Sequence, residues 1–301
     1  MSKTRRSRWR HWLGAVTLAL VGAGLPAAAR GYSLLPLAAE QADTLPHGLA
    51  EGILGVAYFR NLRFPPFTPP GTLQHQDLVA IPQFGFRIGA GGWAEIQASF
   101  ETLYLNEEAT NEGTNRQLGP GDLRMFTKVR VMREGEVWPG LGLRFGTKLP
   151  NASRSTRLGT DDTDFGADVL ASKDLGPVAA HVNLGLLLLG NSGPTIPTAS
   201  GSFKAGGQDD TLHYDVALVS APLGRPQPGS VTLKLVGELV GLGFSHFHNE
   251  QSALRLGLQM QRGPGTLYLG TSAGLISGSE DFGASAGFIY TFQPAKLFDG
   301  T

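Results

Sequence analysis

Two neighbouring stretches of the chain alternate apolar and polar side chains with a period of two. In GDLRMFTKVRVM, residues 121–132, one set of alternate positions holds Leu123, Met125, Thr127, Val129 and Val131. In GLGLRFGTKLP, residues 140–150, the corresponding set runs from Leu141 to Leu149. A period of two is typical of β-strands that present one apolar and one polar face. This pattern restricts the chain to architectures built from two-faced sheets.

The polar face of these two strands carries long cationic side chains. They are Arg124, Lys128, Arg130, Arg144 and Lys148. A buried soluble core does not tolerate such charges without partners. The polar face therefore either meets bulk water on the outside of a β-sandwich or lines a wet lumen inside a barrel that lipid surrounds.

The first residues indicate export from the cytoplasm. Five cations between Lys3 and Arg10 precede an apolar run over residues 12–25, and Ala27, Ala28 and Ala29 follow it. This is the layout of a secretory signal peptide, and the apolar run is too short to span a membrane as a helix. We therefore expect residues 1–29 to be a signal peptide.

Composition excludes several classes of exported protein. Removal of residues 1–29 takes five of the 25 Lys and Arg and none of the 25 Asp and Glu, which leaves a net charge of −5. This acidic balance argues against nucleic-acid binding. The chain has no cysteine, which excludes a disulfide scaffold and a thiolate metal site. No later segment is apolar enough for a membrane helix, so residence in a bilayer requires a closed barrel.

Strand-like segments recur along the rest of the chain. We predict twelve, at residues 48–60, 77–87, 93–105, 121–132, 140–150, 164–175, 178–190, 210–222, 230–244, 251–261, 266–276 and 282–292. Most suit tilted strands that cross a bilayer, which need about 9–11 residues. Short connections, such as residues 89–92, tend to alternate with longer ones, such as residues 106–120. Short periplasmic turns opposite longer extracellular loops are typical of outer-membrane barrels.

The faces of the other strands agree with this arrangement. Glu95 and Glu101 share one face of their strand, and Lys234 and Arg255 likewise oppose leucines on theirs. A lysine or arginine that faces lipid costs about 2–4 kcal/mol at mid-depth. The sorting predicts an all-β, transmembrane antiparallel β-barrel of about 12 strands over residues 48–292. Residues 30–47 lack periodicity and are predicted to be an extended periplasmic lead-in, and residues 293–301 a periplasmic C-terminal tail.

Pro82 interrupts one of the predicted strands. A closed barrel has no free edge at which the missing N–H of a proline is harmless. We therefore expect a bulge or a locally shifted register at Pro82.

Several of these segments resemble one family of outer-membrane proteins. The segments are GDLRMFTKVRV, LGLRFGTKLP and LGTDDTDFGADVLASKDLGPVAAHVNLGLLLLG, and TLPHGLAEG is similar to the way those chains enter their first strand. The likeness to the MetA-pathway of phenol degradation family extends over nearly the whole mature chain. It implies a β-barrel of the bacterial outer membrane that moves small compounds, often aromatic or hydrophobic. The family name does not imply an enzymatic activity.

The polar faces supply the candidate lumen residues. We predict that ten charged side chains line the pore: Arg124, Lys128, Arg130, Arg144, Lys148, Glu95, Glu101, Asp168, Lys234 and Arg255. In one interpretation the cations form a selectivity wall that favours anions. In the other, the charges pair across strands and fill a narrow lumen, because a twelve-stranded barrel lies between side-chain-filled and open barrels.

The segment SHFHNE raises two chemical alternatives. His246, His248 and Glu250 occupy alternate positions, which suits a metal site, but no fourth ligand is indicated and we predict none. Serine near histidine also raises phospholipase-like hydrolysis, with Ser245 or Ser252 as the nucleophile. Nothing in the sequence activates either serine, so we predict no enzyme and no cofactor.

Together these features predict a monomeric channel or facilitator in the bacterial outer membrane. It would take up small solutes passively, including aromatic or hydrophobic compounds, and loop 191–208 or loop 61–76 would fold inward to constrict it. The expected partners are outer-membrane lipid and lipopolysaccharide, the barrel-assembly machinery and the solute, with no nucleic acid. A membrane-embedded hydrolase and a plugged barrel whose loops bind partners are the alternatives.

Overall fold

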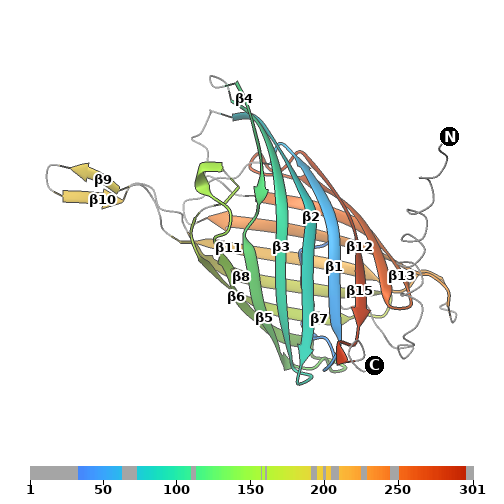
Figure 1. Ribbon diagram of the computed structural model, residues 1–301. Helices are drawn as coiled ribbons and strands as arrows, with labels where there is room; N and C mark the ends of the chain where they lie inside the picture. The colour runs from blue at the N-terminus through green and yellow to red at the C-terminus, as the bar shows by residue number, and fades with distance from the viewer. Residues whose placement is uncertain are drawn as a thin grey trace, which may run out of the picture.

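Twelve strands form one closed antiparallel barrel (Figure 1) in the computed structural model, which describes residues 33–62, 73–109, 113–156, 158–159, 161–190, 195–198, 201–204, 210–224, 229–244 and 251–295. The strands are β1 (Ala50–Arg60), β2 (Leu73–Ala90), β3 (Ala94–Ala109), β5 (Leu123–Met132), β6 (Gly140–Leu149), β7 (Asp164–Asp174), β8 (Val178–Leu188), β11 (Thr211–Ser220), β12 (Thr232–Phe244), β13 (Gln251–Arg262), β14 (Gly265–Gly274) and β15 (Phe282–Phe292). Each strand pairs with the barrel strands before and after it, and β1 pairs with β15. The predicted twelve-stranded barrel is confirmed.

Three shorter strands lie outside this ring. β4 (Gly113–Pro120) pairs with the second half of β3, and Figure 1 shows β2, β3 and β4 rising beyond the rim. β9 (Thr195–Thr198) and β10 (Gly201–Lys204) form a separate hairpin that points away from the barrel (Figure 1). The described part of loop 191–208 therefore does not fold into the lumen as expected. These strands are short and weakly alternating, so the sequence pattern did not indicate them.

The two ends of the barrel differ in their connections. Residues 91–93, 175–177 and 263–264 connect strands at one end, which we call the short-turn end. Longer segments, such as residues 150–163, connect strands at the other end, which we call the long-loop end. Because β1 begins and β15 ends at the short-turn end, the chain enters the first barrel strand and leaves the last one on the same side of the barrel.

The outer surface of the barrel is apolar. Outward residues that are 44–52% exposed include Phe84, Leu143, Leu184, Leu218 and Leu254. Most charged residues of the strands alternate with this set and are buried or half-buried, so they face inward. Within the described ranges, no helix has the length and apolar character that a membrane-spanning helix requires.

The register of β2 shifts at Pro82, as predicted. β2 pairs regularly with β3 from His75 to Ala80 and again from Gln83, with an irregularity between Ala80 and Gln83. The pairing of β2 with β1 shifts at the same level, between Gly55 and Ala57. The shift takes Pro82 out of the regular ladder, where its missing N–H would leave a carbonyl unpaired.

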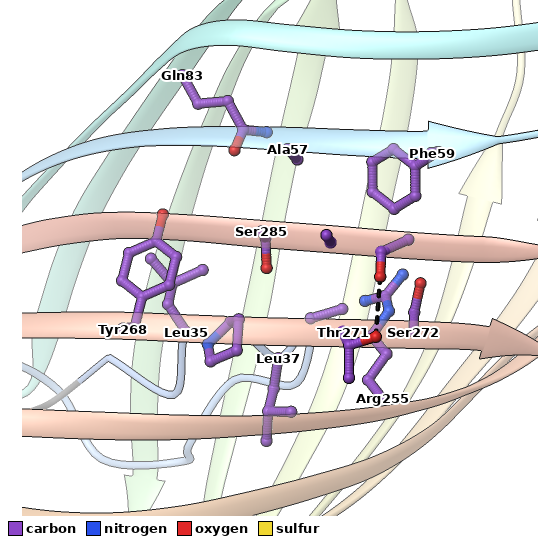
Figure 2. A pocket seen from close by; sticks show the side chains of 14 residues that line it. Leu35, Leu37, Ala57, Phe59, Gln83, Arg255, Tyr268, Thr271, Ser272 and Ser285 are labelled. Carbon is purple, nitrogen blue, oxygen red and sulfur yellow. Dashed lines mark hydrogen bonds between the residues drawn. The ribbon is translucent and has the colours of Figure 1, made fainter.

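Residues 33–49 lie inside the barrel, and we call this segment the plug. It leads into β1 at the short-turn end, and Figure 2 shows its residues Leu35 and Leu37 among the inner side chains of the wall. Its apolar side chains join a buried cluster with the inner face of β11 and β12, made of Leu34, Leu37, Ala39, Ala217, Val219 and Val236. From the sequence we expected an extended lead-in ahead of the barrel, because the segment has no periodicity that would indicate these contacts.

A second segment narrows the lumen near the long-loop end. Loop 150–163 places two side chains in an apolar cluster with inward side chains of β1, β2 and β3, which we call the mouth cluster: Ala57, Leu78, Ala80, Leu103, Leu105, Ala152 and Leu158. Asp122 fixes the start of the loop, since its Oδ1 accepts hydrogen bonds from the N–H groups of Asn151 and Ala152, both at 3.0 Å. The inward loop is therefore one that the sequence analysis did not single out.

Candidate functional site in the barrel lumen

The ten charged residues predicted to line the pore all occupy inward positions of barrel strands. Six of the cations contact a carboxylate: Arg124 with Glu101 at 2.9 Å, Lys128 with Glu95 at 3.3 Å, Arg130 with Asp43 at 2.6 Å, Arg144 with Asp168 at 3.1 Å, Lys148 with Asp164 at 2.5 Å and Arg255 with Glu238 at 3.3 Å. Lys234 shares the inner face of β12 with Glu238. This geometry corresponds to the pairing interpretation rather than to a wall of unpaired cations.

Glu40 of the plug lies at the centre of a buried charged cluster. Its carboxylate accepts hydrogen bonds from both Nη atoms of Arg87, at 2.7 and 3.2 Å, from Lys128 Nζ at 3.3 Å and from Gln97 Nε2 at 3.3 Å. Burial alone would raise the pKa of Glu40, but the neighbouring positive charges, Arg87 first, outweigh it and lower the pKa from 4.5 to about 2. Glu40 is therefore a carboxylate at any physiological pH.

Other inner-wall side chains bind the plug through its backbone. Asn183 accepts a hydrogen bond from the Glu40 N–H at 2.6 Å and donates one to the Glu40 carbonyl at 2.8 Å. Glu238 accepts from two consecutive plug N–H groups at 3.0 and 2.5 Å, and Gln259 donates to two plug carbonyls at 3.0 and 2.7 Å. These side chains pair backbone groups that would otherwise be buried without partners. The plug is thus docked at defined positions.

Two glycines of the wall make room for Pro36 of the plug. A Cβ added at Gly257 would overlap the proline ring, and one added at Gly270 would lie 2.5 Å from Pro36 Cγ. Both glycines lie within strands, where glycine ordinarily weakens a sheet and often marks the close approach of another backbone. A Cβ at Gly142 would similarly lie 2.9 Å from the carbonyl oxygen of Ala42. These three glycines therefore allow close contact between the plug and the wall.

Space remains in the lumen on two sides of the plug. A cavity of about 200 Å³ is lined by Leu35, Phe59, Tyr268 and Arg255, among others (Figure 2). A second cavity of about 250 Å³ adjoins β2, β3 and β5 and also includes Tyr268, with Arg124 among its cations. An apolar cavity of about 150 Å³ can hold a benzene molecule. Each space is therefore large enough for a small aromatic compound.

A serine and a histidine do meet in the lumen, at a place the sequence analysis did not consider. Ser172 Oγ lies 2.8 Å from His181 Nδ1 and also accepts a hydrogen bond from the Ala42 N–H at 2.8 Å. The pair therefore holds the plug. Of the two candidate nucleophiles, Ser252 forms hydrogen bonds through its backbone near the long-loop end, and Ser245 lies outside the described residues.

A metal site can be sought only among the residues that the structure describes. Among the residues that the structure describes, no group of three or more His, Asp or Glu side chains is placed to hold a metal ion. His246, His248 and Glu250 lie outside those residues, as does the predicted signal peptide at residues 1–29. For these segments the sequence-based expectations stay predictions.

The residues that hold the plug were largely missed by sequence reasoning. Glu40 lies in the aperiodic lead-in, Arg87 near the end of a predicted strand, and Asn183 was one polar position among many. One signal was available. Gly257 and Gly270 are inward glycines that leave space beside Pro36, although other inward glycines, such as Gly55 and Gly185, face side chains of the wall instead.

Comparison with known proteins shows a fold. No family model and no curated protein matches the chain. Among solved structures, an outer-membrane channel from Pseudomonas putida F1 is 14% identical over 83% of this chain and 98% of that chain, with a TM-score of 0.58. The β domain of the Bordetella autotransporter BrkA is 13% identical over 81% of this chain and 99% of that chain, with a TM-score of 0.51. The translocator domain of the autotransporter NalP from Neisseria meningitidis is 14% identical over 94% of each chain, with a TM-score of 0.50.

At these identities the likeness is one of architecture. The chain is an all-β, closed, twelve-stranded antiparallel barrel, and it is similar in fold to barrels of bacterial outer membranes. The apolar outer surface of the barrel is suited to contact with lipid.

Proposed function

We propose that the protein is an outer-membrane channel for passive uptake of small solutes and that movement of the plug opens it. The observation that supports this proposal most strongly is that the lumen is filled by the plug and not by side chains of the wall alone. Near the short-turn end, a separate chain segment occupies the space, and glycines of the wall face that segment. A twelve-stranded barrel lies between filled eight-stranded barrels and open sixteen-stranded ones. Removal of the plug would therefore leave a wet passage.

The chemistry of the lumen supports solutes that are partly apolar, including aromatic compounds. The mouth cluster lines the long-loop end with aliphatic side chains. The cavity beyond it adds Phe59 and Tyr268 beside Arg255. The resemblance of the sequence to the MetA-pathway of phenol degradation family supports the same class of solute. In this proposal the barrel acts as a monomer within outer-membrane lipid and lipopolysaccharide, after insertion by the barrel-assembly machinery, and performs no covalent chemistry.

Planar-bilayer recordings of the mature chain and of a variant without residues 33–46 test the proposal. The deletion leaves β1 intact, since β1 begins at Ala50. We expect brief or small openings from the mature chain and a steady, larger conductance from the deletion variant. Liposome swelling in a small sugar provides a second readout. A deletion variant that inserts as a folded barrel but neither conducts nor admits solute would contradict the channel.

A plugged barrel that only binds partners is the second candidate, and the hydrogen bonds between wall and plug favour it. Asn183, Glu238 and Gln259 together give the plug six such bonds. The wild-type protein distinguishes the two candidates. If it stays closed at every voltage and with every solute while the deletion variant conducts, the plug is a structural part and not a gate.

A further inference from the structure

The contacts of Glu40 describe a binding site that belongs to the barrel wall. Arg87 on β2, Gln97 on β3 and Lys128 on β5 direct four donor atoms at one carboxylate, at 2.7 to 3.3 Å. The guanidinium of Arg87 contacts both oxygens, and this fork geometry matches a carboxylate. Glu95 holds the other two donors in place, 3.3 Å from Lys128 Nζ and 2.8 Å from Gln97 Nε2. All of the donor side chains belong to the wall, and only the carboxylate that they bind belongs to the plug.

Departure of the plug would remove the acceptor from this site. The side chains of Arg87 and Lys128 are only 11% and 0% exposed, and a buried charge that loses its partner is strongly unfavourable. Glu95 stays in the wall, and Glu51 lies opposite Arg87 in the register of β1 and β2. Glu51 Oε1 accepts a hydrogen bond from Thr291 at 3.4 Å. These two carboxylates reduce the net charge, but neither takes the place of the two oxygens that Arg87 binds.

We propose that Arg87, Gln97 and Lys128 bind the carboxylate of a transported solute and that Glu40 occupies this site as a tethered substitute in the closed barrel. The inference rests on the proposed channel function and narrows its solute to small monocarboxylates with an apolar body. The cavity of about 250 Å³ adjoins Glu40 and is lined by Phe126 as well as Arg87. A solute that binds there displaces Glu40, so solute arrival favours release of the plug.

Chemical rescue tests the site. Glu40→Ala removes the carboxylate that the plug supplies to these donors and leaves space for an added anion. We expect acetate to raise the Tm of purified Glu40→Ala by about 2–4 °C more than chloride at equal ionic strength. The same exchange of salts on the wild type gives the non-specific effect of acetate, and acetamide is the neutral control. Glu40→Ala combined with Arg87→Gln should lose most of the rescue.

The possible results test the carboxylate site and the channel function independently of each other. If Glu40→Ala does not stay folded in chloride, its refolding yield in acetate, chloride and acetamide replaces Tm as the readout. Equal Tm or equal yield in acetate and chloride, after subtraction of the wild-type effect, overturns the proposed site. Bilayer recordings are scored separately. Rescue without conductance retains the carboxylate site and rejects the channel, whereas conductance without rescue retains the channel and rejects the site.

Discussion

The lumen is narrowed at two levels by two different kinds of contact. Near the short-turn end, the plug docks through buried charges and hydrogen bonds, with Glu40 held by Arg87 and Lys128. Near the long-loop end, Ala152 and Leu158 of loop 150–163 pack into the apolar mouth cluster. Within the described residues, the plug is joined to the barrel only at β1, whereas loop 150–163 is joined at both ends, to β6 and β7.

This difference indicates which closure can act as a gate. Removal of one partner of a buried ion pair costs about 3–5 kcal/mol, so the plug has a defined docked position that a competing ion can disturb. Apolar packing contributes in proportion to area, about 25 cal/mol per Å², and tolerates small shifts. We therefore expect the plug to set whether the channel is open, and the mouth cluster to set which solutes enter.

Glu40→Gln is expected to raise the open fraction of the channel more than any other substitution considered below. The amide keeps the size of the side chain but removes the charge that Arg87 and Lys128 bind, so docking weakens by about 3–5 kcal/mol. The open fraction in single-channel recordings should rise by about 10² to 4 × 10³-fold. Glu101→Gln is the matched control. Its partner Arg124 has a side chain that is 43% exposed, and such pairs contribute about 0–1 kcal/mol.

The pH dependence of the unfolding midpoints of wild type and Glu40→Gln checks that Glu40 is responsible for the difference. Because the folded-state pKa of Glu40 is lowered from 4.5 to about 2, its contribution to stability is present above pH 4.5 and is lost as the pH falls toward 2. The difference in unfolding midpoint between wild type and Glu40→Gln should be constant above pH 4.5 and shrink below it. A difference that disappears at higher pH would assign the effect to another group.

Gly257→Ala should have an intermediate effect. The added methyl group overlaps the ring of Pro36, and overpacking of this kind typically costs about 1–3 kcal/mol. The open fraction should rise by about 5- to 140-fold. Gly237→Ala on the neighbouring strand is the control, since its Cβ would meet Leu256 at an ordinary 3.5 Å. If Gly257→Ala and Gly237→Ala give the same recordings, the plug is not seated against this wall.

Leu158→Ala should have the smallest effect on opening. It removes a side chain of the mouth cluster that is 8% exposed, which destabilises that packing by about 2 kcal/mol and leaves the plug contacts in place. Proteolysis within loop 150–163 should become faster while the open fraction stays unchanged. An open fraction that rises as much as in Gly257→Ala would show that the two closures are coupled.

The barrel could be predicted from the sequence because lipid imposes a rule on every strand. Each strand needs an apolar residue at alternate positions, so residues 121–132 were assigned within two residues of β5. The plug follows no such rule. Its contacts join Glu40 to Arg87 and to Asn183, 47 and 143 residues away in the chain, and no local period encodes such distances. Pairing of the lumen cations likewise depends on which strands become neighbours.

The central claim is that the plug is a displaceable closure, and a reversible cross-link tests it most directly. The chain has no cysteine, so Ala42→Cys with Ser172→Cys introduces a single pair. Ala42 N and Ser172 Oγ are 2.8 Å apart, which places the two residues within reach of a disulfide. The account predicts that oxidised channels stay closed and that reductant restores wild-type openings in the same bilayer, while each single-cysteine variant conducts in both conditions. Oxidised channels with a verified cross-link that conduct as well as reduced ones would contradict it.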